Sequence, residues 1–287
     1  MDVMTCKNGD IEIAYETFGT TGEPVLLIAA MGIESRLAWH EDFCEALVDK
    51  GFHVARFDNR DGGMSSRVAP GVKYSLREMA DDTVAVLDAL AWPSAHLFGL
   101  SLGGMIGQVM AVHHADRVRT LTSVASAPSN QWRVSRPKLG AAFKVITLGR
   151  KVGSGPDAAG DFLVEMFKII GSPAYPVDEA WIRAISRRYP NDPAVAMRHL
   201  TAIRISGDRR GELARVTVPT LVLHGEDDPM QSMHAARETA RAVPGARLVS
   251  YPGMGHDFPR ELWPAMIAEL VQHCQQNAAS TTWPSDR

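Results

Sequence analysis

A serine flanked by glycines is the residue of this sequence whose setting points most directly to chemistry. Gly99, Ser101 and Gly103 stand in the stretch GLSLGG, between apolar residues 95–98 and residues 105–112, whose pattern predicts a helix. A strand that turns sharply into a helix needs small residues beside the turn, and it leaves the central side chain exposed at the carboxyl edge of the sheet. The sequence therefore predicts that Ser101 is presented as a nucleophile.

A serine hydroxyl is a weak nucleophile at neutral pH, so it needs a histidine to accept its proton and a carboxylate to orient that histidine. The apolar segment VTVPTLVLHGEDDP ends in an acidic turn with Glu226, Asp227 and Asp228. His256 follows in the glycine-rich stretch PGMGH, just after the last predicted strand. The chain order of serine, acid and histidine fits this type of site. The residues alone leave open which carboxylate orients His256, with Asp257 as a further candidate.

Strand and helix patterns alternate along most of the chain. Short apolar segments rich in β-branched residues predict strands at residues 11–18, 25–29, 53–57, 96–98, 121–125, 220–224 and 247–251. Helical periodicity separates most of them, and Ser75 with Glu78 forms a capping box that opens one such helix. This alternation predicts an α/β fold with a mostly parallel sheet.

Residues 129–210 interrupt the alternation. They carry helical patterns around residues 139–148, 162–170, 179–187 and 195–205, with no convincing strand between them. We interpret this segment as a helical cap inserted into a core domain that is made of residues 1–128 and 211–287.

The combination of turn, acid and histidine resembles the α/β-hydrolase superfamily over nearly the whole chain. The resemblance implies an α/β-hydrolase fold and selects Asp228, because the acid of that family usually lies three residues past the glycine that ends its strand. It makes Ser101 the nucleophile, His256 the base and Asp228 the orienting acid. The backbone N–H groups of Leu102 and Ile33 would form the oxyanion hole, with Met31 where the family commonly has histidine.

A narrower resemblance joins the Met31-Gly32 strand exit, Trp39, the turn at residues 58–65, the VTVPTLVLHGEDDP segment and the PGMGH loop. These features are similar to those of aclacinomycin methylesterases and serine macrolide esterases. The resemblance implies a bulky polyketide ester as substrate, and we predict opening of a macrolide lactone, which would inactivate an antibiotic. The alternatives are an anthracycline-type methylesterase, a general esterase for small esters, and a weakly catalytic ligand receptor on the same fold.

Large apolar side chains of the helical segment, together with Met31, are candidates for the wall of a substrate pocket. Those in the segment are Trp132, Met166, Phe167, Tyr175, Trp181 and Met197. Each also suits the interior of the segment, since aromatic side chains pack wherever helices meet.

Composition and charge limit the classes of function. The chain has 287 residues, of which 45% are hydrophobic and 22% charged, and its net charge of −3 predicts no general attraction to nucleic acid. No basic run suggests a membrane surface, and the polar start MDVMTCKNGD does not resemble a signal peptide. Cys6, Cys44 and Cys274 show no metal or redox spacing. We therefore expect a cytoplasmic enzyme for a small ester or lactone, without a metal or organic cofactor.

Overall fold

An eight-stranded, mostly parallel sheet forms the centre of the molecule. The computed structural model describes residues 2–31, 36–69, 71–149, 157–188 and 192–278. The strand order is β1-β2-β4-β3-β5-β6-β7-β8; β2 pairs antiparallel with both β1 and β4, and the other neighbours run parallel. The strands are β1 (Met4–Asn8), β2 (Ile11–Phe18), β3 (Glu23–Ile28), β4 (Phe52–Phe57), β5 (Ala95–Leu100), β6 (Val118–Val124), β7 (Thr220–Gly225) and β8 (Arg247–Tyr251). This arrangement confirms the predicted α/β fold.

The seven predicted strands correspond to β2 through β8, with ends that differ by up to three residues. The edge strand β1 was not predicted. Its sequence MTCKN is mostly polar and its side chains are exposed or half-buried. An edge strand like this one is specified by backbone pairing with β2 rather than by an apolar pattern, so periodicity does not reveal it.

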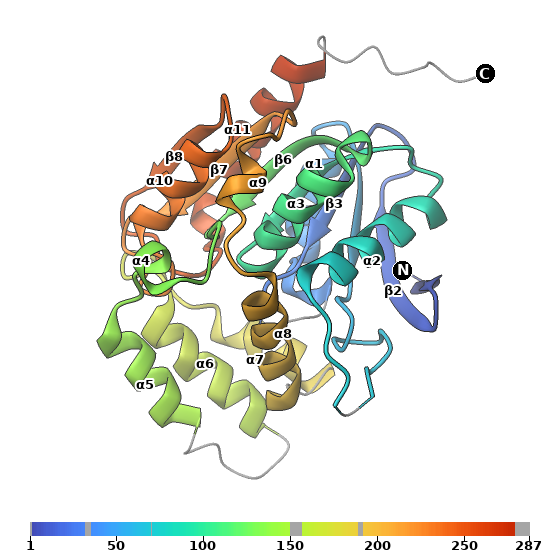
Figure 1. Ribbon diagram of the computed structural model, residues 1–287. Helices are drawn as coiled ribbons and strands as arrows, with labels where there is room; N and C mark the ends of the chain where they lie inside the picture. The colour runs from blue at the N-terminus through green and yellow to red at the C-terminus, as the bar shows by residue number, and fades with distance from the viewer. Residues whose placement is uncertain (1, 32–35, 70, 150–156, 189–191, 279–287) are drawn as a thin grey trace, which may run out of the picture.

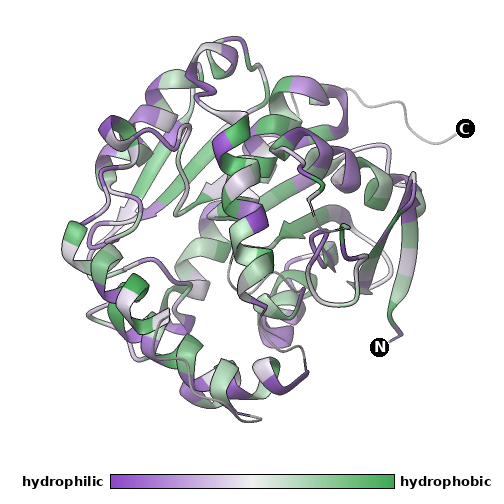
Figure 2. Cartoon of the chain, turned by 60° about the horizontal axis from the view of Figure 1, so that its bottom comes forward, coloured by the Kyte–Doolittle hydropathy of each residue, from purple (hydrophilic) through white to green (hydrophobic). Residues whose placement is uncertain are grey.

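Helices cover both faces of the sheet (Figure 1). One face packs against α2 (Leu76–Ala89), α3 (Leu102–His113) and α10 (Met233–Ala242), and the other against α1 (Glu41–Val48) and α11 (Trp263–Ala278). Alternate residues of β3 divide between these two layers, with Leu26 on the first face and Leu27 on the second. Figure 2 shows the strands mostly in hydrophobic colours and much of the polar colour on the outer helices and loops. The core is therefore a double layer around a sheet that is buried on both sides.

The predicted capping box is present at the start of α2. The hydroxyl of Ser75 accepts a hydrogen bond from the backbone N–H of Arg77, and the Glu78 carboxylate accepts one from the N–H of Ser75 at 2.9 Å. These contacts satisfy N–H groups that have no partner inside the helix.

Between β6 and β7 the described residues form helices and loops and no strand. The helices are α4 (Trp132–Ser135), α5 (Leu139–Gly149), α6 (Ala158–Ile170), α7 (Glu179–Arg188), α8 (Pro193–Ser206) and α9 (Arg210–Leu213). Figure 1 shows α5 to α8 gathered at one end of the molecule. We call residues 129–210 the helical segment; its treatment as a separate domain stays a prediction. None of the helices in the described ranges is long and apolar enough to cross a membrane.

The buried carboxylate of Asp61, in the turn that follows β4, binds the helical segment. Asp61 is fully buried, and it has the positive φ of 69° that glycine adopts most easily. Its side chain accepts hydrogen bonds from the Tyr74 hydroxyl at 2.7 Å, from the Val68 N–H at 2.7 Å and from two nitrogens of Arg198 on α8 at 3.0 Å each. Burial alone would raise the pKa of Asp61, but these donors lower it below its usual range.

Replacing Arg198 by methionine should destabilise the protein by about 2 kcal/mol, because it removes a charged donor pair from a buried carboxylate. For a chain of this size we expect a fall in Tm of about 3 °C at neutral pH. The Asp61 pKa is lower in the folded state, so the stabilisation is present above the ordinary carboxyl pKa and is lost as the pH falls through the folded value. Differential scanning calorimetry at several pH values measures both effects.

Arg204→Met is the matched control, because Arg204 lies on the same helix and is exposed. Equal Tm values for the Arg198 and Arg204 variants would contradict the proposed role of the Asp61 contact.

Candidate active site

The turn between β5 and α3 has the geometry that the GLSLGG stretch predicts. Ser101 follows β5 directly, precedes the first residue of α3, and has φ 51° and ψ −108°. A non-glycine residue in such a conformation is strained by about 1–3 kcal/mol. The structure holds it with a hydrogen bond from the Ser101 N–H to the Val124 carbonyl at 2.8 Å, and another from the Ser126 hydroxyl to the Ser101 carbonyl at 2.8 Å.

The glycines beside Ser101 are required by close backbone contacts. A Cβ at Gly99 would lie 2.3 Å from the carbonyl oxygen of Gly103, and one at Gly103 would lie 2.0 Å from that of Ile28. Neither distance is compatible with a side chain. The turn is therefore tight enough to place the Ser101 hydroxyl at the carboxyl end of the sheet.

The three residues selected by the sequence lie within hydrogen-bond distance of one another. Ser101 Oγ is 3.0 Å from His256 Nε2, and His256 Nδ1 is 2.7 Å from Asp228 Oδ2. The other oxygen of Asp228 accepts hydrogen bonds from the N–H groups of Met230 at 2.7 Å and Gln231 at 2.8 Å. These bonds fix the carboxylate, and the carboxylate in turn fixes the imidazole with Nε2 toward the serine.

The neighbouring carboxylates point elsewhere. Asp227 accepts a hydrogen bond from the Gly253 N–H at 3.1 Å, Glu226 accepts one from the Ser250 hydroxyl at 2.7 Å, and Asp257 binds Ser172. Asp228 is therefore the carboxylate that contacts the His256 ring in the structure.

Two carboxylates affect the pKa of His256. Burial of the ring disfavours its protonated form, whereas the charge and hydrogen bond of Asp228 and the charge of Asp257 favour it. The net effect is to raise the pKa of His256 above the ordinary histidine value of 6.5. A raised pKa makes the imidazole a stronger base toward the serine proton.

One of the two predicted oxyanion donors lies in the described part of the chain. Leu102 is the first residue of α3, so its N–H has no acceptor within the helix and is available beside Ser101. Ile33, the second predicted donor, lies outside the described residues.

A cavity of about 290 Å³ opens beside Ser101 and His256. Met31, Met166, Phe167 and Trp181, four of the residues predicted for its wall, line it. Trp132, which was also predicted for the wall, does not line the cavity: it lies at the start of the short helix α4, with 54% of its surface exposed. Tyr175 and Met197 are also not among the lining residues; Met197 is exposed, and Tyr175 packs on the core beside the loop of His256.

Three aromatic residues of the wall were not predicted. They are His40, which precedes α1, and Phe258 and Trp263, which follow His256. The His40 ring lies 5.7 Å from the Trp181 ring and 5.4 Å from the Trp263 ring, measured between centroids. Proximity to His256 in the chain is a signal for Phe258 and Trp263, but no local pattern indicates His40.

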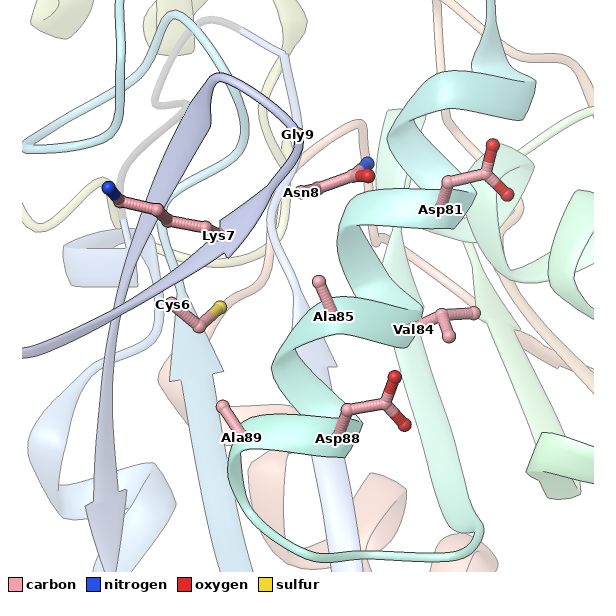
Figure 3. Close-up of a pocket in the computed structure, with 9 residues that line it drawn as sticks. All are labelled: Cys6, Lys7, Asn8, Gly9, Asp81, Val84, Ala85, Asp88 and Ala89. Atoms are coloured by element: carbon pink, nitrogen blue, oxygen red, sulfur yellow. The ribbon is translucent and has the colours of Figure 1, made fainter.

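A second pocket, of about 490 Å³, lies between β1 and α2 (Figure 3). It is lined by Cys6, Lys7, Asn8, Gly9, Asp81, Val84, Ala85, Asp88 and Ala89. Burial and the nearby carboxylates raise the pKa of the Cys6 thiol to about 11, so the thiol stays protonated near neutral pH. The thiol of this pocket is therefore not activated as a nucleophile. All three cysteines are free, and the described residues contain no cluster of three or more potential metal ligands.

Comparison with known proteins identifies the family of the chain. The family model for the alpha/beta hydrolase fold matches residues 23–148, and a model for TAP-like proteins matches residues 203–282. Rhodomycin D methylesterase DnrP from Streptomyces peucetius is 29% identical over 95% of this chain and 98% of its own length.

A putative carbamate hydrolase, RutD from Pseudomonas syringae pv. syringae, is 30% identical over 81% of this chain and 86% of its own length. The crystal structure of esterase RhEst1 from Rhodococcus sp. ECU1013 superimposes with a TM-score of 0.78 at 21% identity, over 96% of this chain and 99% of that one. The chain therefore belongs to the alpha/beta hydrolase family and is an enzyme of the hydrolase class.

Proposed function

We propose that this hydrolase cleaves carboxylic esters with Ser101 as nucleophile, His256 as base and Asp228 as the acid that orients the histidine. The observation that carries the proposal is the pair of contacts at 3.0 Å and 2.7 Å that links the three side chains, of which Ser101 and His256 line an apolar cavity. A serine in this setting can transfer its proton as it attacks.

In the first step the Ser101 oxygen bonds to the ester carbonyl carbon while its proton moves to His256 Nε2. The carbonyl oxygen becomes an oxyanion, which the N–H of Leu102 stabilises, with Ile33 as the proposed second donor. One such donor is worth roughly 3 kcal/mol at the transition state. His256 then donates the proton to the departing alkoxide, leaving an acyl group on Ser101. Water, deprotonated by His256, attacks the acyl carbon, and the proton returns to Ser101 as the acid leaves.

The ester that we propose is a methyl ester carried by a bulky aromatic polyketide. Two relatives that align with more than nine-tenths of this chain are named rhodomycin D methylesterases. The aromatic wall formed by His40, Trp181 and Trp263 suits a flat ring system. A cavity of about 290 Å³ is at the small end of ligand sites.

The size of the cavity supports one of the two polyketide esters considered from the sequence over the other. A methyl ester is a pendant group, so it can reach Ser101 while most of the ring system stays at the mouth. The ester of a macrolide lactone lies within the ring, so much of the ring must enter with it. We therefore rank the methyl ester first, and the macrolide lactone becomes the alternative that an experiment must test.

Mass spectrometry of incubated substrates tests this proposal. We expect a methyl-esterified anthracycline to lose the mass of one methylene when it is incubated with the protein, because the methyl ester becomes an acid. Ser101→Ala should abolish this change and keep the Tm of the wild type.

A macrolide that gains the mass of one water would instead support lactone opening. Turnover of a carbamate alone would favour the activity named for the RutD relatives. Full activity of purified Ser101→Ala would exclude the mechanism.

The pH dependence of kcat/KM should show an acid limb with an apparent pKa above 6.5, because activity requires neutral His256 and its pKa is raised. Activity is thus lost as the pH falls through that value.

Asp228→Asn should lower kcat by about four orders of magnitude, since an amide no longer stabilises the imidazolium. Steady-state kinetics between about pH 5 and about pH 9, a range that spans the titration of histidine, measure both effects.

Asp227→Asn provides the control for the neighbouring acid, since its carboxylate faces Gly253 and not the His256 ring. We expect its acid limb to coincide with that of the wild type. A larger loss in the Asp227 variant than in the Asp228 variant would reverse the assignment.

Trp181→Ala should raise KM for an aromatic methyl ester by about tenfold with little change in kcat, because it removes one aromatic contact from the wall. Trp132→Ala removes an equally large side chain that does not line the cavity, so its KM should not change. Initial rates over a range of substrate concentrations separate the two constants. Equal KM values for the two variants would exclude the aromatic wall as a substrate contact.

A further inference from the structure

The loop that carries His256 is bound to the helical segment as well as to the sheet. We propose that Ser172, which follows α6, is a positioning residue that holds this loop in the geometry required for proton transfer from Ser101. The proposal rests on the proposed function, because it assigns His256 the role of base. We call residues 252–257 the His256 loop.

Ser172 contacts the His256 loop through both its side chain and its backbone. Its hydroxyl donates to Asp257 Oδ1 and accepts a hydrogen bond from the Gly255 N–H at 2.9 Å. Its N–H donates to Asp257 Oδ2 at 3.0 Å. One serine therefore binds the residues immediately before and after His256, and it is only 6% exposed. Buried hydrogen bonds of this kind hold the joined segments rigidly.

Backbone contacts extend the same connection. The N–H of His256 donates to the carbonyl of Ile170 at 2.8 Å, and the N–H of Ala174 donates to the carbonyl of Gly253 at 3.2 Å. A Cβ at Gly255 would lie 2.2 Å from the carbonyl oxygen of Gly171, so the two backbones touch. The end of α6 and the His256 loop thus form a single packed unit.

This unit links the substrate wall to the base. Phe167 and Ile170 of α6 line the cavity, and Ile170 also accepts the His256 N–H. Ser172 is not among the lining residues, so its effect on the reaction passes through His256 and Asp257. Removing its hydroxyl should alter the chemical step more than substrate binding.

Ser172 also affects the charge next to His256. Burial raises the pKa of Asp257, and the two hydrogen bonds from Ser172 act in the opposite direction by favouring the carboxylate. The titratable groups around the His256 ring are Asp228 at 2.7 Å, Asp257 beside it in the chain, and His224, which lies 3.7 Å from Asp228. Across the cavity stand His40, Asp178, Arg260 and Glu261. Loss of the Ser172 hydroxyl should weaken the negative charge of Asp257 and thereby lower the pKa of His256.

The test compares Ser172→Ala and Ser172→Thr with the wild type, in kcat and KM for a methyl ester and in the rate at which a fluorophosphonate labels Ser101 as a function of pH. We expect Ser172→Ala to lower kcat by about tenfold with unchanged KM, since a misplacement of about 1 Å can cost up to about 100-fold. The acid limb of both profiles should move to lower pH. Ser172→Thr keeps the hydroxyl and should restore both kcat and the limb.

Ser250→Ala is the matched control, because it also removes a hydroxyl that donates to a carboxylate, Glu226, without any contact to His256. It should behave as the wild type. A Ser172→Ala enzyme with wild-type kcat, or with reduced kcat but an unmoved acid limb, would overturn the positioning role.

A second variant keeps the proposal testable if Ser172→Ala does not fold. Asp257→Asn removes the charge at the other end of the same contact and should also move the acid limb to lower pH; an unmoved limb would contradict the proposal. Failure of the proposed function gives a different result, because wild-type Ser101 would then be labelled no faster than the denatured protein.

Discussion

The backbone strain at Ser101 is the constraint on which the rest of the site depends. A positive φ at a non-glycine residue is unfavourable. It persists here because the carbonyl of Val124, the last residue of β6, accepts a hydrogen bond from the Ser101 N–H, and the Ser126 hydroxyl donates one to the Ser101 carbonyl. The close approach of Gly103 to Ile28 packs the start of α3 against β3. The sheet and α3 are therefore fixed relative to each other before any substrate binds. The Ser101 hydroxyl stays at the carboxyl end of β5, within hydrogen-bond distance of His256.

Two carboxylates, Asp228 and Asp257, raise the pKa of His256, the residue that we propose as the base for this hydroxyl. Asp228 contacts the ring directly, and Asp257 acts through its charge. Each is in turn held by hydrogen bonds, Asp228 by the turn after β7 and Asp257 by Ser172. Because ionised carboxylates favour the imidazolium, they would in the proposed mechanism stabilise the proton of Ser101 on His256 while the tetrahedral oxyanion is present.

Some features of the fold and the candidate site can be predicted from the sequence because they depend on residues that are close together in the chain. The strand–turn–helix around Ser101, the parallel strands and the capping box at Ser75 follow from residue type and spacing, because each depends on neighbours within a few positions. The choice of Asp228 over Asp227 depends on which carboxylate turns toward a loop 28 residues away, and residue type alone does not determine that. Trp132 and Trp181 look alike in the sequence, yet only Trp181 lines the cavity. Such differences arise from packing between distant segments.

The helical segment thus does more than cover the cavity. Arg198 ties α8 to the buried Asp61, and Ser172 ties the end of α6 to the His256 loop, so two of the contacts between the segment and the rest of the chain hold different helices. Trp181 and Ile182 of α7 line the cavity. A wall anchored in this way cannot move far at α6 without disturbing the base, because Ile170 both lines the cavity and binds the His256 backbone. A ligand that displaces α6 would therefore also displace the His256 backbone, so the proposed mechanism favours esters that fit the wall without moving this helix.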